Sequence, residues 1–119
     1  MNARGRFDDL PADEIYKGVV RRSFSSVHTT VTSYTFAPGA RFPLHTHPQE
    51  PITLMQEGEA QMTIGDQVES LSPGDWTVVA AEVEHGVRAG PNGTSFLAIV
   101  APRRESSDAY TVFESGGKG

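Results

Sequence analysis

The chain has 119 residues, with 15 acidic and 10 basic side chains and a formal net charge of -5. This length fits one domain, and we expect a single domain over residues 1–119 with its core at about 18–105. The acidic balance argues against a nucleic-acid-binding protein, and the absence of cysteine excludes disulfides, thiolate metal sites and cysteine nucleophiles. Without a long apolar run or an apolar leader, we expect a cytoplasmic protein that does not bind membranes.

The predicted elements are short strands, because runs rich in Val, Thr, Ile, Phe and Tyr alternate with Gly and Pro turns. In chain order, a helical turn or two is predicted first, at Leu10–Tyr16, where Pro11 stands early. The strands follow at Gly18–Arg22, Val27–Phe36, Arg41–His45, Ile52–Glu57, Glu59–Ile64, Gln67–Leu71, Trp76–Val79, Glu84–Ala89 and Ser95–Ala101. This spacing is typical of an all-β sandwich or barrel, and the tail at 114–119 is expected to be flexible.

Large apolar side chains on the predicted strands are expected to line the barrel or fill its core. They are Phe36, Met55, Met62, Trp76 and Phe96.

Three of the four histidines form a pattern that fits a metal site. His45 and His47 are two residues apart near the end of a predicted strand, so both imidazoles point to the same face. His85 lies on a separate strand, and non-adjacent strands of an antiparallel barrel can direct side chains into one cavity. Three neutral imidazoles suit Fe, Zn, Mn, Ni or Cu. His28, on a Thr-rich strand, is interpreted as an ordinary polar residue.

The spacing around these histidines resembles the cupin family. The first cupin motif, G-x5-HxH-x3,4-E-x6-G, is similar to residues 39–58, and the second motif is similar to residues 74–89. The resemblance covers roughly Val27–Pro102. It implies a small cupin double-stranded β-helix (jelly-roll barrel) of the RmlC-like kind, with a divalent metal ion held inside.

One ligand of the first motif is missing. Pro51 stands where the family usually supplies Glu or Gln, and proline offers no ligand atom. Gln49 shares the strand parity of His45 and His47, whereas Glu50 has the better donor but would need a bulge to turn inward. We predict a three-His site with water in the open positions, and Glu50, then Gln49, as candidate fourth ligands.

Within the family, HTHPQEPI and the last strand are similar to a small single-domain group that includes the pectin-degradation (KdgF-like) cupins. In that group an acidic residue on the last strand takes part in proton transfer, and a following arginine binds the sugar acid. Arg104 matches the arginine, so the resemblance implies that it binds an anionic substrate. Ala98 stands in the position of the acid. Glu50 and Arg104 are the candidate catalytic residues.

Two functions remain open. A divalent metal on three histidines keeps its +2 charge and open positions, so it can bind a small organic acid, enol or ketone through paired oxygens. It would then act as a Lewis acid in isomerisation, ring opening or lyase steps, or, as Fe(II), give dioxygenase chemistry. The alternative is a non-catalytic cupin that holds a metal or small ligand, which the missing groups at Pro51 and Ala98 favour.

The resemblance also implies a homodimer, because small cupins of this type commonly pair. The strand Gly18–Arg22 would otherwise be an exposed edge. Val19 and Val20 suggest that this edge is buried against the partner.

Overall fold

The computed structural model describes residues 2–104 and 111–112, and these residues form mainly antiparallel strands. The predicted tail at 114–119 and the last predicted core residue, 105, lie outside the described residues. The elements in chain order are η1 (Phe7–Asp9), β1 (Asp13–Tyr16), β2 (Val19–Ser25), β3 (Thr30–Phe36), β4 (Arg41–Thr46), β5 (Ile52–Ile64), β6 (Gln67–Leu71), β7 (Trp76–Val78), β8 (His85–Val100) and β9 (Thr111–Val112). Across the described part of the chain, no helix has the length and apolar character needed to cross a membrane.

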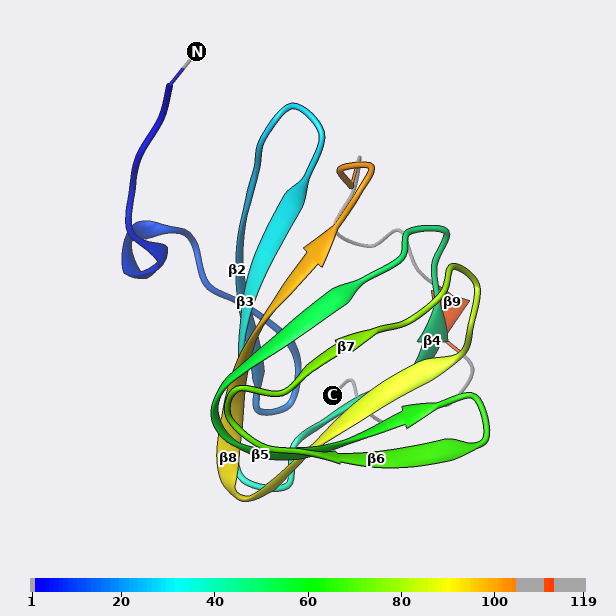
Figure 1. Cartoon of the computed structure of the whole chain (residues 1–119). Helices are drawn as coiled ribbons and strands as arrows, with labels where there is room; N and C mark the ends of the chain where they lie inside the picture. Colours follow the sequence, from blue (N-terminus) through cyan, green and yellow to red (C-terminus); the bar gives the residue numbers. More distant parts are fainter. Residues whose placement is uncertain (1, 105–110, 113–119) are drawn as a thin grey trace.

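The strands form two antiparallel layers that share the long strands β5 and β8 (Figure 1). In the first layer, β8 lies between β3 and the start of β5, with β2 and β1 beyond β3 and with β7 beyond β5. In the second layer, the start of β8 lies between β4 and the end of β5, which pairs in turn with β6. This arrangement confirms the predicted all-β jelly-roll barrel.

β5 and β8 pass from one layer to the other because both bend at the same place. The register between them shifts on both sides of Gly58, which has a φ of 68°, and Gly93 on β8 has a φ of 78°. A Cβ at residue 58 would collide with the carbonyl oxygen of Gly93, so the two backbones meet where no side chain fits. The sequence predicted two strands in place of β5, at 52–57 and 59–64, and two in place of β8, at 84–89 and 95–101. Both predictions are wrong, because each pair forms one continuous strand. Each glycine bends a strand without ending it.

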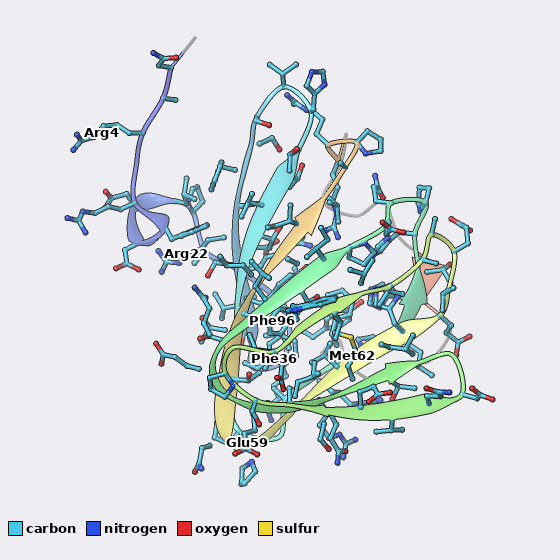
Figure 2. All side chains as sticks on the ribbon, in the orientation of Figure 1. Arg4, Arg22, Phe36, Glu59, Met62 and Phe96 are labelled. Carbon is cyan, nitrogen blue, oxygen red and sulfur yellow. The ribbon has the colours of Figure 1, made fainter. Side chains whose placement is uncertain are left out.

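The core lies between the two layers and contains most of the large apolar side chains predicted for it. Phe36 and Phe96 are 2% and 4% exposed, and their ring centroids are 5.4 Å apart. Figure 2 shows Phe36, Phe96 and Met62 in the interior, on the inward faces of their strands. Met55 is also buried.

Trp76 is the exception, because its side chain is 67% exposed on β7. It lies directly opposite Leu54 of β5, which also points outward. The next residue, Thr77, is the one turned toward the interior, where its hydroxyl lies 3.5 Å from the sulfur of Met62. The prediction of Trp76 as a lining or core residue is therefore wrong. The inward-facing position of this strand is the next residue, Thr77.

The segment before β2 is a strand, not the helix predicted at Leu10–Tyr16. β1 pairs antiparallel with β2, and the buried Arg21 forms a 3.0 Å ion pair with Asp13 across the two strands. A helix of seven residues has too few internal hydrogen bonds to compete with this pairing. β1 thus covers the strand expected to be an exposed edge, and Val19 is fully buried in the protein's own core. The edge argument for a dimer is wrong, and the dimer itself stays a prediction.

We expect Gly58→Ala to lower the free energy of unfolding by about 3 kcal/mol or more, since the positive φ and the contact with Gly93 both penalise a Cβ. Gly39→Ala is the matched control, because Gly39 has a φ of 70° but no atom within 4 Å of an added Cβ. It should cost only about 1 kcal/mol, the penalty of the left-handed backbone. Urea unfolding of the two variants tests this. Equal losses would show that the contact with Gly93 is unimportant.

Candidate metal centre

Three histidines meet inside the barrel, brought there by β4 and β8. His45 lies directly opposite His85 in the pairing of the two strands, and His47 follows one residue after the end of β4. The ring centroids of His45 and His85 are 4.2 Å apart, and that of His47 lies 5.5 Å and 5.0 Å from them. One nitrogen from each ring lies within 4.8 Å of the other two. The pair two residues apart and the distant third histidine therefore converge as predicted.

The orientation of each ring is fixed by a hydrogen bond that it donates to its own stretch of backbone. Nδ1 of His45 lies 2.8 Å from the carbonyl oxygen of Pro43, and Nδ1 of His85 lies 2.9 Å from that of Val83. Nδ1 of His47 lies 2.9 Å from the carbonyl oxygen of Gln49. A carbonyl oxygen only accepts, so each Nδ1 carries the proton and each Nε2 keeps its lone pair. This is the arrangement that a metal-binding histidine requires.

All three imidazoles are held in the neutral form. Burial is the main cause that lowers the pKa of His45 from 6.5 to about 3, and the neighbouring His85 adds to it. Burial also lowers the pKa of His47 from 6.5 to about 4, and it lowers the pKa of His85. The side chains are only 4–7% exposed. Neutral imidazole is the form that binds metal, so the donor set fits a divalent ion.

The neighbours of the histidine pair differ in where their side chains lie. Gln49 is buried, and its Oε1 has no hydrogen-bond partner among the described residues. Glu50 is exposed, and Pro51 is buried. A buried amide oxygen without a partner is costly unless something binds it. Gln49 was expected to point inward because it shares the strand parity of the two histidines, and its burial agrees with this. The side chain of Glu50 lies at the surface.

Arg104 lies close to the histidine cluster. Its positive charge contributes to the lowered pKa of His45, His47 and His85. The backbone N–H of Arg104 donates to Oγ1 of Thr30 at 2.9 Å, and its buried Nε has no hydrogen-bond partner within the part of the chain that the structure describes. Thr30 was missed by the sequence reasoning. The signal available in the sequence was its place on a Thr-rich strand whose side chains alternate between the inward and outward faces.

The described residues place no buried carboxylate in the interior. Ala98 is 8% exposed in the core. The buried polar and charged side chains of the described chain are Arg21, Thr30, Thr32, His45, His47, Gln49, Thr53, His85 and Thr94. Around the histidines, therefore, the described chain supplies imidazole nitrogens, neutral oxygens and the nearby charge of Arg104.

The chain belongs to the cupin family, since the family model described as "Cupin domain" matches residues 32–100. This span contains all three histidines. A comparison with curated proteins gives no significant match.

Solved structures with the same fold include proteins of different size. Oxalate decarboxylase from Lactobacillus farciminis, in complex with formate, is 22% identical with a TM-score of 0.86, and the match covers 95% of this chain but 36% of that one. An RmlC-like cupin from Shewanella frigidimarina is 22% identical with a TM-score of 0.80, covering 88% and 95% of the two chains. KdgF from Halomonas sp. is 22% identical with a TM-score of 0.76, covering 82% and 93%. This chain thus spans about a third of the length of the decarboxylase and nearly all of the other two proteins.

We expect the metal-free protein to lose stability as the pH falls from about 6.5 to about 4. In this range the unfolded histidines bind protons, whereas the folded pKa values of about 3 for His45 and about 4 for His47 keep those residues neutral. Each such proton favours unfolding by about 1.4 kcal/mol per pH unit. Urea unfolding in the presence of a chelator, at a series of pH values, measures the slope.

His45→Asn should lower the slope of the unfolding free energy against pH by the contribution of about one proton. His28→Asn is the control, because His28 is exposed on the loop before β3. If both variants keep the slope of the unmodified protein, the buried histidines are not its source.

Proposed function

We propose that this cupin is a metal-dependent enzyme that acts on a small organic acid. His45, His47 and His85 would hold a divalent ion through Nε2, and Gln49 would add its amide oxygen. Arg104 would bind the carboxylate of the substrate. The observation that carries the proposal is the combination of three neutral imidazoles that converge in the interior with the nearby charge of Arg104, whose buried Nε has no partner among the described residues.

The choice of Gln49 over Glu50 rests on burial. An oxygen ligand must face the ion, and Gln49 is 7% exposed, whereas the carboxylate of Glu50 is at the surface. An all-neutral ligand set leaves the full +2 charge on the ion. Anionic substrates are then attracted more strongly than by a site that includes a carboxylate ligand.

The anion preference is supported by the charges near the site. A guanidinium presents its N–H groups in a fork that matches a carboxylate, and Arg104 has Nε available for this among the described residues. No described acidic side chain is buried to compete with a bound anion. One of the structural neighbours is in line with this, an oxalate decarboxylase with bound formate.

A divalent ion bound at the histidines would supply Lewis-acid chemistry and stabilise negative charge on a substrate oxygen. The chain's own residues would do the rest. Arg104 would orient the carboxylate and offset its charge, and the buried aromatic ring of Phe42, 4.4 Å from the ring of His45, would help to exclude water. These contributions suit isomerisation, ring opening or a lyase step, in which an enolate or carboxylate develops charge.

A second candidate is a non-catalytic cupin that binds a metal and a small anion. The absence of a carboxylate at Ala98 favours it, because proton transfer needs a titratable group near the reacting atoms. Incubating the metal-loaded protein with a panel of keto acids and unsaturated uronates, followed by NMR, separates the two. Product formation supports the enzyme, and binding without turnover of any member supports the second candidate. Oxygen consumption would instead indicate dioxygenase chemistry.

We expect Gln49→Ala to raise the dissociation constant for Zn²⁺ by about tenfold or more, since a fourth ligand is lost. Glu50→Ala, one position along, is the matched control and should bind Zn²⁺ as the unmodified protein does. Competition with a chromophoric chelator measures both. If Glu50→Ala loses as much affinity as His85→Ala, Glu50 is the fourth ligand and the assignment of Gln49 is wrong.

Arg104→Ala should weaken the binding of oxalate to the metal-loaded protein by about tenfold to a hundredfold, because a charge-assisted contact is worth roughly 1.5–3 kcal/mol. Arg88→Ala is the control, since Arg88 is exposed on β8 in the second layer. Isothermal titration with oxalate measures the effect, and glycerol serves as the uncharged comparison. Equal affinities for the two variants would remove Arg104 from the proposed site.

A further inference from the structure

A cavity of about 650 Å³ lies between the amino-terminal segment and the hairpin that joins β2 to β3. None of the three clustered histidines lines it, so it is separate from the metal centre. Its walls come from stretches far apart in the sequence, namely residues 3–7 with Leu10, residues 24–27, and Arg103 after the end of β8. Small-molecule sites usually have volumes of about 300–1,000 Å³. The cavity therefore has the size of a ligand site.

The amino-terminal wall of this cavity is fastened to the sheet. Nη1 of Arg22 on β2 donates to three carbonyl oxygens of the amino-terminal segment. They belong to Phe7, Asp8 and Leu10, at 3.2, 2.7 and 3.3 Å. The ring of Phe7 also packs against that of Phe24, with centroids 5.6 Å apart, and Figure 1 shows the segment running alongside β2. The wall is thus held by specific contacts with β2.

Most of the lining is apolar, with aromatic rings on one side. Phe7 and Phe24 form this aromatic wall, and Leu10 and Val27 add aliphatic surface. Phe24 and Val27 are 48% and 77% exposed, although both are large hydrophobic side chains. Apolar surface in contact with water is unfavourable, so a ligand that covers these side chains gains binding energy from the hydrophobic effect.

The charged part of the lining is entirely basic. Arg4, Arg6 and Arg103 line the cavity, and no acidic side chain does. Among the described residues, no carboxylate lies within ion-pair distance of these three side chains. Asp8 and Asp9 on η1 are close in sequence, but both are exposed. The cavity therefore carries positive charge from two ends of the described chain.

The hairpin side of the cavity leaves the recognition of charge to the arginines. The hydroxyl of Ser26 accepts from the backbone N–H groups of His28 and Thr29, at 3.3 and 3.1 Å. Nη1 of Arg103 donates to the carbonyl oxygen of Ser26 at 3.3 Å, which places this guanidinium against the hairpin. A guanidinium has five N–H donors, so this bond leaves several for a ligand.

We propose that this cavity binds a small aromatic anion, that is, a flat apolar body that carries a carboxylate, sulfonate or phosphate group. The apolar body would pack on Phe7 and Phe24. Arg6 and Arg103 would hold the anionic group, because guanidinium N–H groups match the oxygens of such an anion. This inference is independent of the proposed function, since no metal ligand takes part in it.

The lining favours this class of ligand over the alternatives. A cation would be repelled by three arginines, and a metal ion would find no ligand atom on a guanidinium. An inorganic anion would leave the aromatic wall in water. An uncharged apolar molecule would leave the positive charges without a counter-charge and would desolvate them in part. An aromatic anion satisfies both halves of the lining.

Anilinonaphthalenesulfonate (ANS) has the proposed chemistry, and its fluorescence rises when it binds an apolar site. We expect one equivalent to bind the full chain in the presence of a chelator, with a dissociation constant of about 10–100 µM. Phenylnaphthylamine has the same rings without the sulfonate, and it should bind about tenfold more weakly or less. Equal affinities for the two probes would overturn the proposal, because the arginines would then contribute nothing.

The double substitution Arg6→Gln and Arg103→Gln should weaken the binding of ANS by about tenfold or more. It should change the affinity for phenylnaphthylamine by less than about twofold, since the aromatic wall is intact. Lys17→Gln with Arg88→Gln is the matched control, because it changes the net charge equally at exposed positions outside the cavity. If the control loses as much ANS affinity, net charge attracts the dye and the proposal fails.

Phe24→Ser should weaken the binding of both probes, because both use the aromatic wall. Val68→Ser is its control, since Val68 is 61% exposed on β6 in the second layer. Unchanged binding to Phe24→Ser would place the dye elsewhere and refute the site. If Phe24→Ser fails to fold, the arginine variants decide. An ANS affinity that falls as the protein concentration rises would show that a second copy covers the cavity, which would also refute the proposal.

Discussion

The shared bend of β5 and β8 is the constraint on which the rest of this structure depends. β5 has 13 residues and β8 has 16, and both remain continuous through the crossing at Gly58 and Gly93. Side chains alternate within each half of β8, but the inward parity changes across the bend: positions 85, 87 and 89 are buried before it, and positions 94, 96, 98 and 100 after it. This change allows His85 to face inward near the start of β8 and Phe96 to face inward near its end. The histidine cluster and the aromatic core both depend on the bend, since unbroken alternation would turn one of them outward.

The histidine cluster is organised locally, and this explains how it tolerates burial. Each ring donates Nδ1–H to a carbonyl oxygen two residues away on its own segment, so no distant element is needed to orient it. Arg104 is different, because Thr30, 74 positions earlier, holds its backbone. The ligand atoms are thus set by short-range geometry. The positive charge near them depends on how the end of β8 packs beside β3.

Strand parity and motif spacing were sufficient to predict the three histidines, the barrel and most of the core. These two signals gave wrong predictions where a single residue changes which side chains of a strand face inward. They also failed where pairing with a distant strand overrides the local preference for a helix or a strand end. Gly58 resembles a strand end in sequence, and only the backbone of Gly93 against it makes it a bend. Trp76 was assigned to the wrong face because the phase of a three-residue strand cannot be read from three residues. Glu50 was ranked above Gln49 on donor strength, whereas the structure buries Gln49 and leaves Glu50 exposed, a difference that the sequence does not give.

The continuity of β8 also limits how the sequence of this protein can change over time. A one-residue insertion or deletion in β8 after the bend would turn every later side chain to the opposite face, exchanging the core row with the row that contains Leu97 and Ile99. The turn at 65–66 carries no such penalty, since it only joins β5 to its neighbour β6 at the surface. Length variation among descendants of this chain should therefore concentrate in this turn, while the length of β8 after the bend stays fixed.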